Sequence, residues 1–263
     1  MKICFILERG VPPRQNPVIM EAIAQLEHGG AKVSMMYPEE ELFRLDNMSI
    51  EADFYLLKSD TELSLSIATV LAALGAKVVN RVAACLTAKD KTLAAATLFH
   101  AGIPTPSSYV AYHPQQFDKQ INHSPLIFKP NRGYHGAGIK IVGDPTNIPD
   151  CQDFPDMVFV QDYLADARKD LKIFAIADKI FGVRKTFSTN SFLHTGEPVS
   201  LTPEMEETAR RCGQAFGLDL YGLDIAETPE ADYVVDVNYF PGYRGVPDAA
   251  THLVNYIIGA ARA

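Results

Sequence analysis

The sequence predicts an α/β domain with a parallel sheet, followed by an α+β region built on antiparallel sheets. Three observations predict this fold class. Short apolar runs alternate with helical patterns over residues 1–86, which is typical of strand–helix–strand units with right-handed crossovers. A strand, a glycine-rich loop and a second strand follow over residues 124–142, which favours an antiparallel hairpin. Residues 220–238 have the pattern of a strand, a turn and a strand.

The first domain is expected to span residues 1–86 and to begin with a buried strand. Residues 2–7 are an almost continuous apolar run, which is typical of such a strand. A helix then starts at Asn16 and Pro17, because Pro suits the first helical position, and it ends at Gly29. Further strands are expected over residues 31–36, 53–58 and 76–80, and a second helix over residues 61–74.

The rest of the chain is expected to form a central subdomain over residues 87–160 and a C-terminal subdomain over residues 161–263. Pro104 and Pro106 mark a linker, because Pro interrupts both helices and strand ladders. The expected strands cover residues 124–130, 139–142, 157–163, 169–177, 179–187, 220–227 and 232–238, and the expected helices cover residues 89–101, 202–216 and 248–261.

Composition excludes several classes of protein. The chain has 263 residues, of which 47% are hydrophobic and 21% charged, as in ordinary soluble domains. The net charge of −8 argues against nucleic-acid binding, and no apolar run approaches the roughly 20 residues that span a membrane. The four cysteines are far apart, so reduced thiols are expected. No protease, lipase or eukaryotic protein-kinase motif is present, and we expect a cytoplasmic protein.

Asp224, Asp236 and Asn238 form the strongest candidate site. Alternate residues of a strand share a face, so Asp236 and Asn238 point the same way. The turn between the two strands then places Asp224 roughly opposite Asp236. Three oxygen donors in an apolar setting suit Mg²⁺ bound together with substrate phosphates. The alternative is a surface hairpin whose acids are solvated.

A glycine-rich loop is the second candidate site. Gly133, Gly136 and Gly138 allow backbone amides to turn toward an anion, and Lys129 ends the preceding strand. His135 lies at the tip of the loop, where a solvated side chain is the simpler interpretation. The loop leads into a strand and not a helix, so it is neither a P-loop nor a Rossmann motif. A purely structural turn is the alternative.

The third candidate site follows the apolar strand over residues 157–163. Its last residues could present backbone amides to an adenine edge between apolar walls, and Asp170 could accept hydrogen bonds from ribose hydroxyls. A buried core strand without a ligand is the alternative. The residues concerned are Gln161, Asp162, Tyr163 and Leu164.

These features and Lys91 occur in the order and spacing of the ATP-grasp superfamily, which the chain resembles from about residue 88 to its C-terminus. The resemblance implies an ATP-grasp fold behind the N-terminal α/β domain. Residues 89–106 and the glycine loop are similar to the ribosomal-protein glutamate ligases. Residues 234–246 are similar to the inositol-phosphate kinases of the same fold.

The resemblance also implies a role for each candidate residue. Lys91 and Lys129 would contact the phosphates of ATP, beneath a lid formed by residues 133–138. Lys172 and Arg184 would stabilise the phosphoryl group during its transfer. Gln161, Asp162, Tyr163 and Leu164 would surround the adenine and Asp170 would bind the ribose of ATP. Mg²⁺, or Mn²⁺ in its place, would be ligated by Asp224, Asp236 and Asn238. Apart from the resemblance, the substrate is expected to meet Arg14, Asn238, Gly242, Tyr243 and Arg244. Arg14 follows the first strand, where open α/β sheets place ligands, and an exposed loop arginine is its alternative.

The ligase branch usually has Glu where this chain has Asp162 and Asp236, and its segment before the ribose position is about one residue longer. Asp236 is instead typical of the kinases. We favour a ligase that activates a carboxylate as an acyl-phosphate for attack by an amine or thiol. The alternatives are a kinase acting on a hydroxyl and a nucleotide-binding module without turnover. A small-molecule or peptide substrate is expected, and a homodimer is a reasonable expectation.

Overall fold

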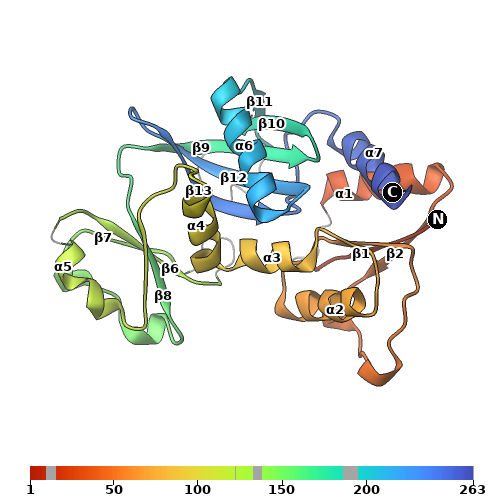
Figure 1. Cartoon of the computed structure of the whole chain (residues 1–263), viewed down its shortest axis with the longest axis horizontal. Helices are drawn as coiled ribbons and strands as arrows, with labels where there is room; N and C mark the ends of the chain where they lie inside the picture. The colour runs from red at the N-terminus through yellow and green to blue at the C-terminus, as the bar shows by residue number, and fades with distance from the viewer. Residues whose placement is uncertain (10–15, 122, 133–137, 186–194, 263) are drawn as a thin grey trace.

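The computed structural model describes residues 1–9, 16–121, 123–132, 138–185 and 195–262. Within these ranges the strands form three sheets, here called A, B and C in the order of the chain. Figure 1 shows sheet B at one end of the molecule, sheet A at the other and sheet C between them. A parallel sheet followed by two antiparallel sheets confirms the predicted fold class.

Sheet A is parallel, with the strand order β2-β1-β3-β4. Its helices begin where capping residues satisfy their free amides. The Asn16 side chain accepts hydrogen bonds from the amides of Val18 and Ile19, and the Thr61 side chain accepts one from Ser64. The elements are β1 (Lys2–Ile6), α1 (Pro17–His28), β2 (Lys32–Met36), β3 (Phe54–Leu57), α2 (Glu62–Ala73) and β4 (Val78–Val79).

Sheet B is antiparallel, has the order β5-β8-β6-β7 and carries a core of its own. The Phe128 ring lies 5.7 Å from the Phe117 ring and 6.5 Å from the Phe154 ring, in a cluster separate from the main core. Two helices precede the sheet in the chain. The elements are α3 (Val82–Lys89), α4 (Lys91–His100), β5 (Ser108–Ala111), α5 (Asp118–Ile121), β6 (Leu126–Pro130), β7 (Lys140–Val142) and β8 (Val158–Asp162).

Sheet C is antiparallel, with the order β11-β10-β9-β12-β13. Helix α6 covers one face, where Met205 lines the same hollow as Ile173 and Ile225 of the sheet. Helix α7 packs against α1 (Figure 1). The elements are β9 (Arg168–Ile176), β10 (Lys179–Arg184), β11 (Glu197–Val199), α6 (Pro203–Phe216), β12 (Leu220–Glu227), β13 (Asp232–Tyr239) and α7 (Ala249–Arg262).

Sheets A and C share one continuous hydrophobic core. Asn80 joins them, because its side chain donates to the carbonyl of Leu220 and accepts from the amides of Asp219 and Leu220. The Tyr239 hydroxyl adds a hydrogen bond of 3.1 Å to the Ser59 carbonyl. The carboxyl ends of the strands of sheet A are therefore held next to β13.

The structure adds α3, α5, β5 and β11 to the expected elements. Asp90 has extended backbone angles, so it ends α3 and caps α4 where a single helix was expected over residues 89–101. β5 and β11 are short strands at the edges of their sheets. Their residues are mostly exposed, so neither shows the alternation of apolar and polar residues that predicts a strand.

Replacing Asn80 with Ala is expected to destabilise the joined sheets. The change leaves one carbonyl and two amides near residue 220 without their partner, which should lower the free energy of unfolding by about 2–3 kcal/mol. Thermal unfolding should shift down by roughly 5–10 °C. Asn147→Ala, at an exposed position, is the control and should melt like the unaltered protein. Equal melting of both variants would contradict the joining role of Asn80.

Candidate active site

One face of sheet C carries the charged residues that the sequence singled out. Asp224 of β12 pairs directly with Asp236 of β13 on one side and with Lys172 of β9 on the other. Directly paired residues of antiparallel strands point to the same face, so these three side chains lie in one row. Asn238, two residues after Asp236, is on that face as well and is exposed.

Each carboxylate of this row has a lysine partner. Lys172 Nζ lies 2.6 Å from Asp224 Oδ1, and Lys91 Nζ lies 3.5 Å from Asp236 Oδ1. About a third of each carboxylate side chain remains exposed, 33% for Asp224 and 35% for Asp236. The structure therefore brings together two expected metal ligands, one expected phosphate-binding lysine and one expected phosphoryl-stabilising lysine.

Lys91 reaches this face because α4 begins with it. Asp90 caps α4 by accepting from the amides of Thr92 and Leu93. Asn131, which follows β6, donates to Asp90 at 2.8 Å and accepts from the Thr92 amide and hydroxyl. The start of α4 is thus tied to the segment that leads into the glycine-rich loop.

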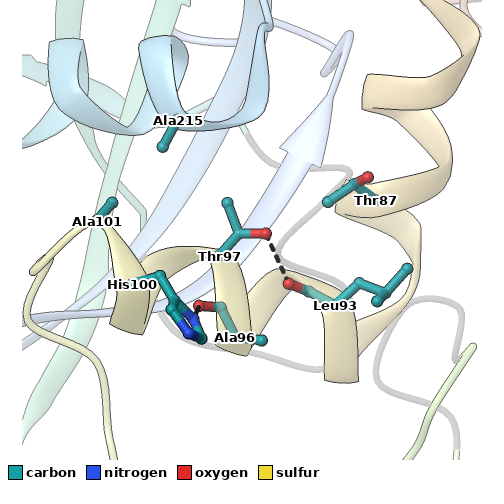
Figure 2. Close-up of a pocket in the computed structure, with 7 residues that line it drawn as sticks. All are labelled: Thr87, Leu93, Ala96, Thr97, His100, Ala101 and Ala215. Carbon is teal, nitrogen blue, oxygen red and sulfur yellow. Dashed lines mark hydrogen bonds between the residues drawn. The ribbon is translucent and has the colours of Figure 1, made fainter.

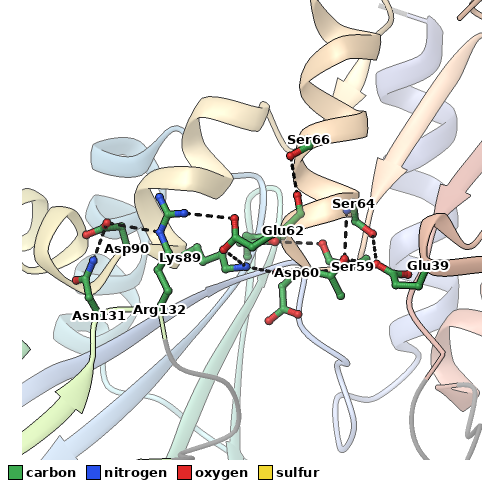
Figure 3. A network of polar contacts seen from close by, with 12 residues as sticks. Glu39, Ser59, Asp60, Glu62, Ser64, Ser66, Lys89, Asp90, Asn131 and Arg132 are labelled. Atoms are coloured by element: carbon green, nitrogen blue, oxygen red, sulfur yellow. Dashed lines mark hydrogen bonds and ion pairs between the residues drawn. The ribbon is translucent and has the colours of Figure 1, made fainter. Parts of the chain in front are cut away.

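A polar network links this segment to the N-terminal domain, as Figure 3 shows. Arg132 contacts Glu62 of α2 at 3.3 Å and Asp90 at 3.9 Å. Lys89 contacts Glu62 at 3.0 Å and donates to the Asp60 carbonyl. All three parts of the chain therefore meet at the first residues of α4.

Lys129 lies on the face of sheet B opposite to the Phe128 cluster. Its side chain is 8% exposed, and its Nζ donates to Gln161 Oε1 at 2.6 Å. Gln161 in turn donates to the Ser108 hydroxyl at 3.0 Å. The side chain of Gln161 therefore positions Lys129, a role that sequence reasoning missed.

The connection from sheet B to sheet C holds the residues expected around adenine and ribose. The amide of Asp162 donates to Ser107 and that of Tyr163 to Pro125, after which Leu164 begins the turn toward β9. Asp170 accepts from Arg168 and Arg184. Burial raises the pKa of the Asp170 carboxyl, but these hydrogen bonds outweigh burial and hold its pKa below the usual value.

The placement of Arg184 corrects the expectation that it lies beside Lys172. Arg184 pairs with Leu171 and therefore belongs to the face that α6 covers, whereas Val183 pairs with Lys172. Its guanidinium contacts Glu227 at 2.7 and 3.1 Å and Asp170 at 2.6 Å. Hydrogen bonds to Glu227, and then to Asp170, raise the pKa of Arg184 further. Arg184 is a structural ion-pair residue in this arrangement.

Lys185 is the basic residue that strand register brings to the face of Asp224. It follows Val183 by two residues, and its amide donates to the Asp170 carbonyl at 2.8 Å, which continues the ladder past β10. Its side chain is only 6% exposed. The resemblance of the sequence assigns phosphoryl stabilisation to Arg184, because the choice between positions 184 and 185 requires the pairing of β10 with β9.

The residues expected to meet the substrate lie in different environments. Tyr243 is a correction: it is fully buried and its hydroxyl donates to the Ala175 carbonyl at 2.9 Å, so it belongs to the core. Arg244 is partly buried, and Gly242 accepts a hydrogen bond from the Asn16 side chain.

Gly138, at the end of the glycine-rich loop, has a left-handed backbone (φ +74°), and a Cβ there would lie 2.8 Å from Pro130. Arg14, Gly133, His135 and Gly136 lie outside the described residues.

The donor set fits a magnesium ion that shares its coordination with phosphate. In the part of the chain that the structure describes, no group of three or more His, Cys, Asp and Glu side chains could hold a metal ion. Two carboxylates and an amide are too few for an all-protein cage, but Mg²⁺ characteristically uses one or two carboxylates plus phosphate oxygens and water. The pair formed by Asp224 and Asp236 meets that requirement.

A separate hollow lies away from these residues. It has a volume of about 530 Å³ and lies between α3, α4 and α6, where Thr87, Leu93, His100 and Ala215 line it (Figure 2). None of the expected nucleotide-binding or metal-binding residues lines it. This hollow is therefore distinct from the candidate active site.

Comparison with known proteins decides the family. A profile of the RimK-like ATP-grasp domain matches residues 88–259, well over half of the chain. The chain belongs to this family. It is similar to a probable alpha-L-glutamate ligase of Thioalkalivibrio sulfidiphilus, with 28% identity over 204 residues that cover 70% of this chain and 68% of the relative.

Solved structures show the same fold. The RimK-like protein is similar to a RimK domain ATP-grasp protein from Sphaerobacter thermophilus, with a TM-score of 0.80, 19% identity and coverage of 98% of this chain and 100% of the other. It is also similar to a D-alanine–D-alanine ligase from Bacillus anthracis complexed with ATP, with a TM-score of 0.77, 21% identity and coverage of 100% and 97%.

Family membership confirms the resemblance to the ATP-grasp superfamily and the expectation of an ATP-dependent carboxylate–amine ligase. It favours the ligase branch of the two that the sequence resembles. Among the described helices, none combines the length and apolar character that crossing a bilayer requires. The roles of the individual site residues stay predictions.

Replacing Arg184 with Met is expected to destabilise the RimK-like protein. Glu227 and Asp170 would each lose a partly buried partner, which should lower the free energy of unfolding by about 1–3 kcal/mol. Arg210→Met is the control, because the exposed pair of Arg210 with Glu206 is worth about 0.5 kcal/mol or less. Chemical denaturation of both variants measures the difference, and equal stability would count against a structural role for Arg184.

Proposed function

We propose that the protein joins a carboxylate to an amine by the following chemistry, with Mg²⁺ as its metal ion. A carboxylate oxygen of the substrate attacks the γ-phosphorus of ATP, the bond to the β-phosphate breaks, and ADP leaves. The nitrogen of an amine then attacks the acyl carbon, phosphate leaves and the amine loses a proton. Family membership supports this reaction class, and the row of Asp224, Asp236 and Lys172 supports its location.

The observation that carries the proposal is the pairing of both carboxylates with lysines from different parts of the fold. Lys91 comes from the start of α4 and Lys172 from β9, yet both meet the acidic row of sheet C. Carboxylates suit a hard cation and ammonium groups suit phosphate oxygens, so this row matches the alternating charges of a metal–triphosphate complex.

The chain's own residues would act mainly through position and charge. Lys91 and Lys129 would hold the phosphates, and Lys172 would offset negative charge that builds up during transfer. Asp224, Asp236 and Asn238 would hold Mg²⁺, which when bound supplies further positive charge to the phosphates. The segment from Gln161 to Leu164 would surround the adenine, and Asp170 would accept from the ribose. Acceleration then depends on alignment of the attacking oxygen with the phosphorus.

The kinase alternative rests on one observation, which is Asp236 in place of the usual Glu of the ligases. Both reactions share the transfer of the γ-phosphoryl group and differ in the attacking oxygen. A carboxylate leads to a reactive acyl-phosphate, whereas a hydroxyl leads to a stable phosphate ester. The product therefore distinguishes the two functions.

Trapping with hydroxylamine is expected to reveal the acyl-phosphate. The protein is incubated with Mg-ATP, hydroxylamine and a panel of carboxylates that begins with L-glutamate, because a relative is named a probable alpha-L-glutamate ligase. Formation of a hydroxamate together with ADP is the expected result. A second panel, of hydroxyl compounds, tests the alternative. ADP with a stable phosphate ester from that panel, and no hydroxamate from any acid, would instead establish a kinase. Stabilisation by Mg-ATP without turnover on any acid would indicate a binding module.

Replacing Asp236 with Asn is expected to weaken binding of Mg-ATP about 10–100-fold, because one anionic oxygen donor becomes neutral. The fold should remain intact, since the side chain is 35% exposed. Asp232→Asn, on the same strand but lining the hollow beside α6, is the matched control. Calorimetric titration with Mg-ATP measures both variants. Unchanged affinity and unchanged magnesium dependence in Asp236→Asn would remove Asp236 from the metal site.

A further inference from the structure

Lys185 is a buried cation on the charged face of sheet C. Its side chain is only 6% exposed although it lies at the end of β10. Register places it on the same face as Lys172, because Val183 pairs with Lys172 and Lys185 lies two residues further along. Lysines at strand ends usually extend their ammonium group into water, so the burial of this one requires an explanation.

The side chain of Lys185 is held in position by its surroundings. Its ammonium group lies 5.6 Å from the centre of the Phe174 ring, within the range of a cation–π contact. Gly196 lies against its stem, where a Cβ would come within 2.6 Å of Lys185 Cγ. The absence of a side chain at position 196 therefore makes room for the lysine.

The charges around Lys185 are mostly of the same sign. The pKa of Lys185 is lowered to about 8, first by burial and then by the neighbouring Lys172 and Arg244, while Asp224 opposes them. Across the described ranges, no carboxylate forms an ion pair with Lys185, and Asp224 is already paired with Lys172 at 2.6 Å. A buried cation beside two other cations is unfavourable unless an anion joins them.

We infer that Lys185 binds the γ-phosphoryl group of ATP during its transfer, in the role that the sequence alone assigns to Arg184. This inference rests on the proposed function and adds to it the residue that contacts the reacting end of the nucleotide. Lys172, Lys185 and Arg244 then form a cationic cradle next to Asp224. Arg184 does not belong to this cradle, because both terminal nitrogens of its guanidinium group already contact Glu227.

The test compares two nucleotides that differ only at the γ position. Calorimetric titration measures the affinity of Mg-AMPPNP, a non-hydrolysable ATP analogue, and of Mg-ADP for the unaltered protein and for Lys185→Met. Met keeps the length and the apolar stem of the side chain and removes its charge. Lys185→Met is expected to bind Mg-AMPPNP at least about tenfold more weakly while its affinity for Mg-ADP stays within about twofold, as expected for loss of one charged contact. Lys185→Arg should restore part of the preference for Mg-AMPPNP.

Lys179→Met is the matched control, because Lys179 is exposed at the opposite end of β10, and it should bind both nucleotides like the unaltered protein. Three outcomes would overturn the inference: unchanged binding of Mg-AMPPNP by Lys185→Met, an equal loss for both nucleotides, or loss of the preference in Arg184→Met with Lys185→Met unaffected. The first would also result if Lys185 contacted only the substrate carboxylate. Failure of the unaltered protein to bind Mg-ADP would overturn the proposed function together with the inference.

Discussion

Two carboxylates that face each other across neighbouring strands are the constraint on which the candidate site depends. Like charges directly opposite each other in a sheet destabilise it unless cations lie nearby. Here the cations come from β9, as Lys172, and from the start of α4, as Lys91. Lys91 reaches Asp236 only when α4 packs at the edge of sheet C. The packing of α4 is therefore coupled to the charge balance of the site.

The packing of α4 in turn depends on short polar contacts. Asp90 and Asn131 hold the first turn of α4 against the end of β6, while Arg132 and Glu62 connect the same point to α2. These residues carry no chemistry of their own. They set where the ammonium group of Lys91 lies relative to Asp236. The site therefore depends on contacts from α2 and from the end of β6, although its acids come from sheet C alone.

Much of this arrangement could be predicted from the sequence because it depends on local rules. Asn16 and Thr61 mark helix starts by their capping chemistry, and the turn after β12 brings Asp224 close to Asp236. Their direct pairing also needs the register shift between Asp224 and Ile225, because the register next to the turn, which pairs Ile225 with Val234, would place Asp224 opposite Val235. Family membership likewise followed from the order of the motifs. Features set by distant pairing could not be predicted: the choice between Arg184 and Lys185 depends on how β10 meets β9, and the burial of Tyr243 depends on its packing against Phe174.

The separate core of sheet B has a consequence for the entry of a nucleotide. Sheets A and C share one core and form a single frame, whereas the Phe128 cluster belongs to sheet B alone. A hinge motion of sheet B would leave both cores intact but would break polar contacts at the start of α4. These are the hydrogen bonds of Asn131 to Asp90 and Thr92 and the charged contacts of Arg132. Dissolved salt weakens charged contacts, whereas sulfate and similar salts strengthen apolar packing. A rise in ionic strength is therefore expected to loosen the attachment of sheet B through Arg132 more than it loosens either core.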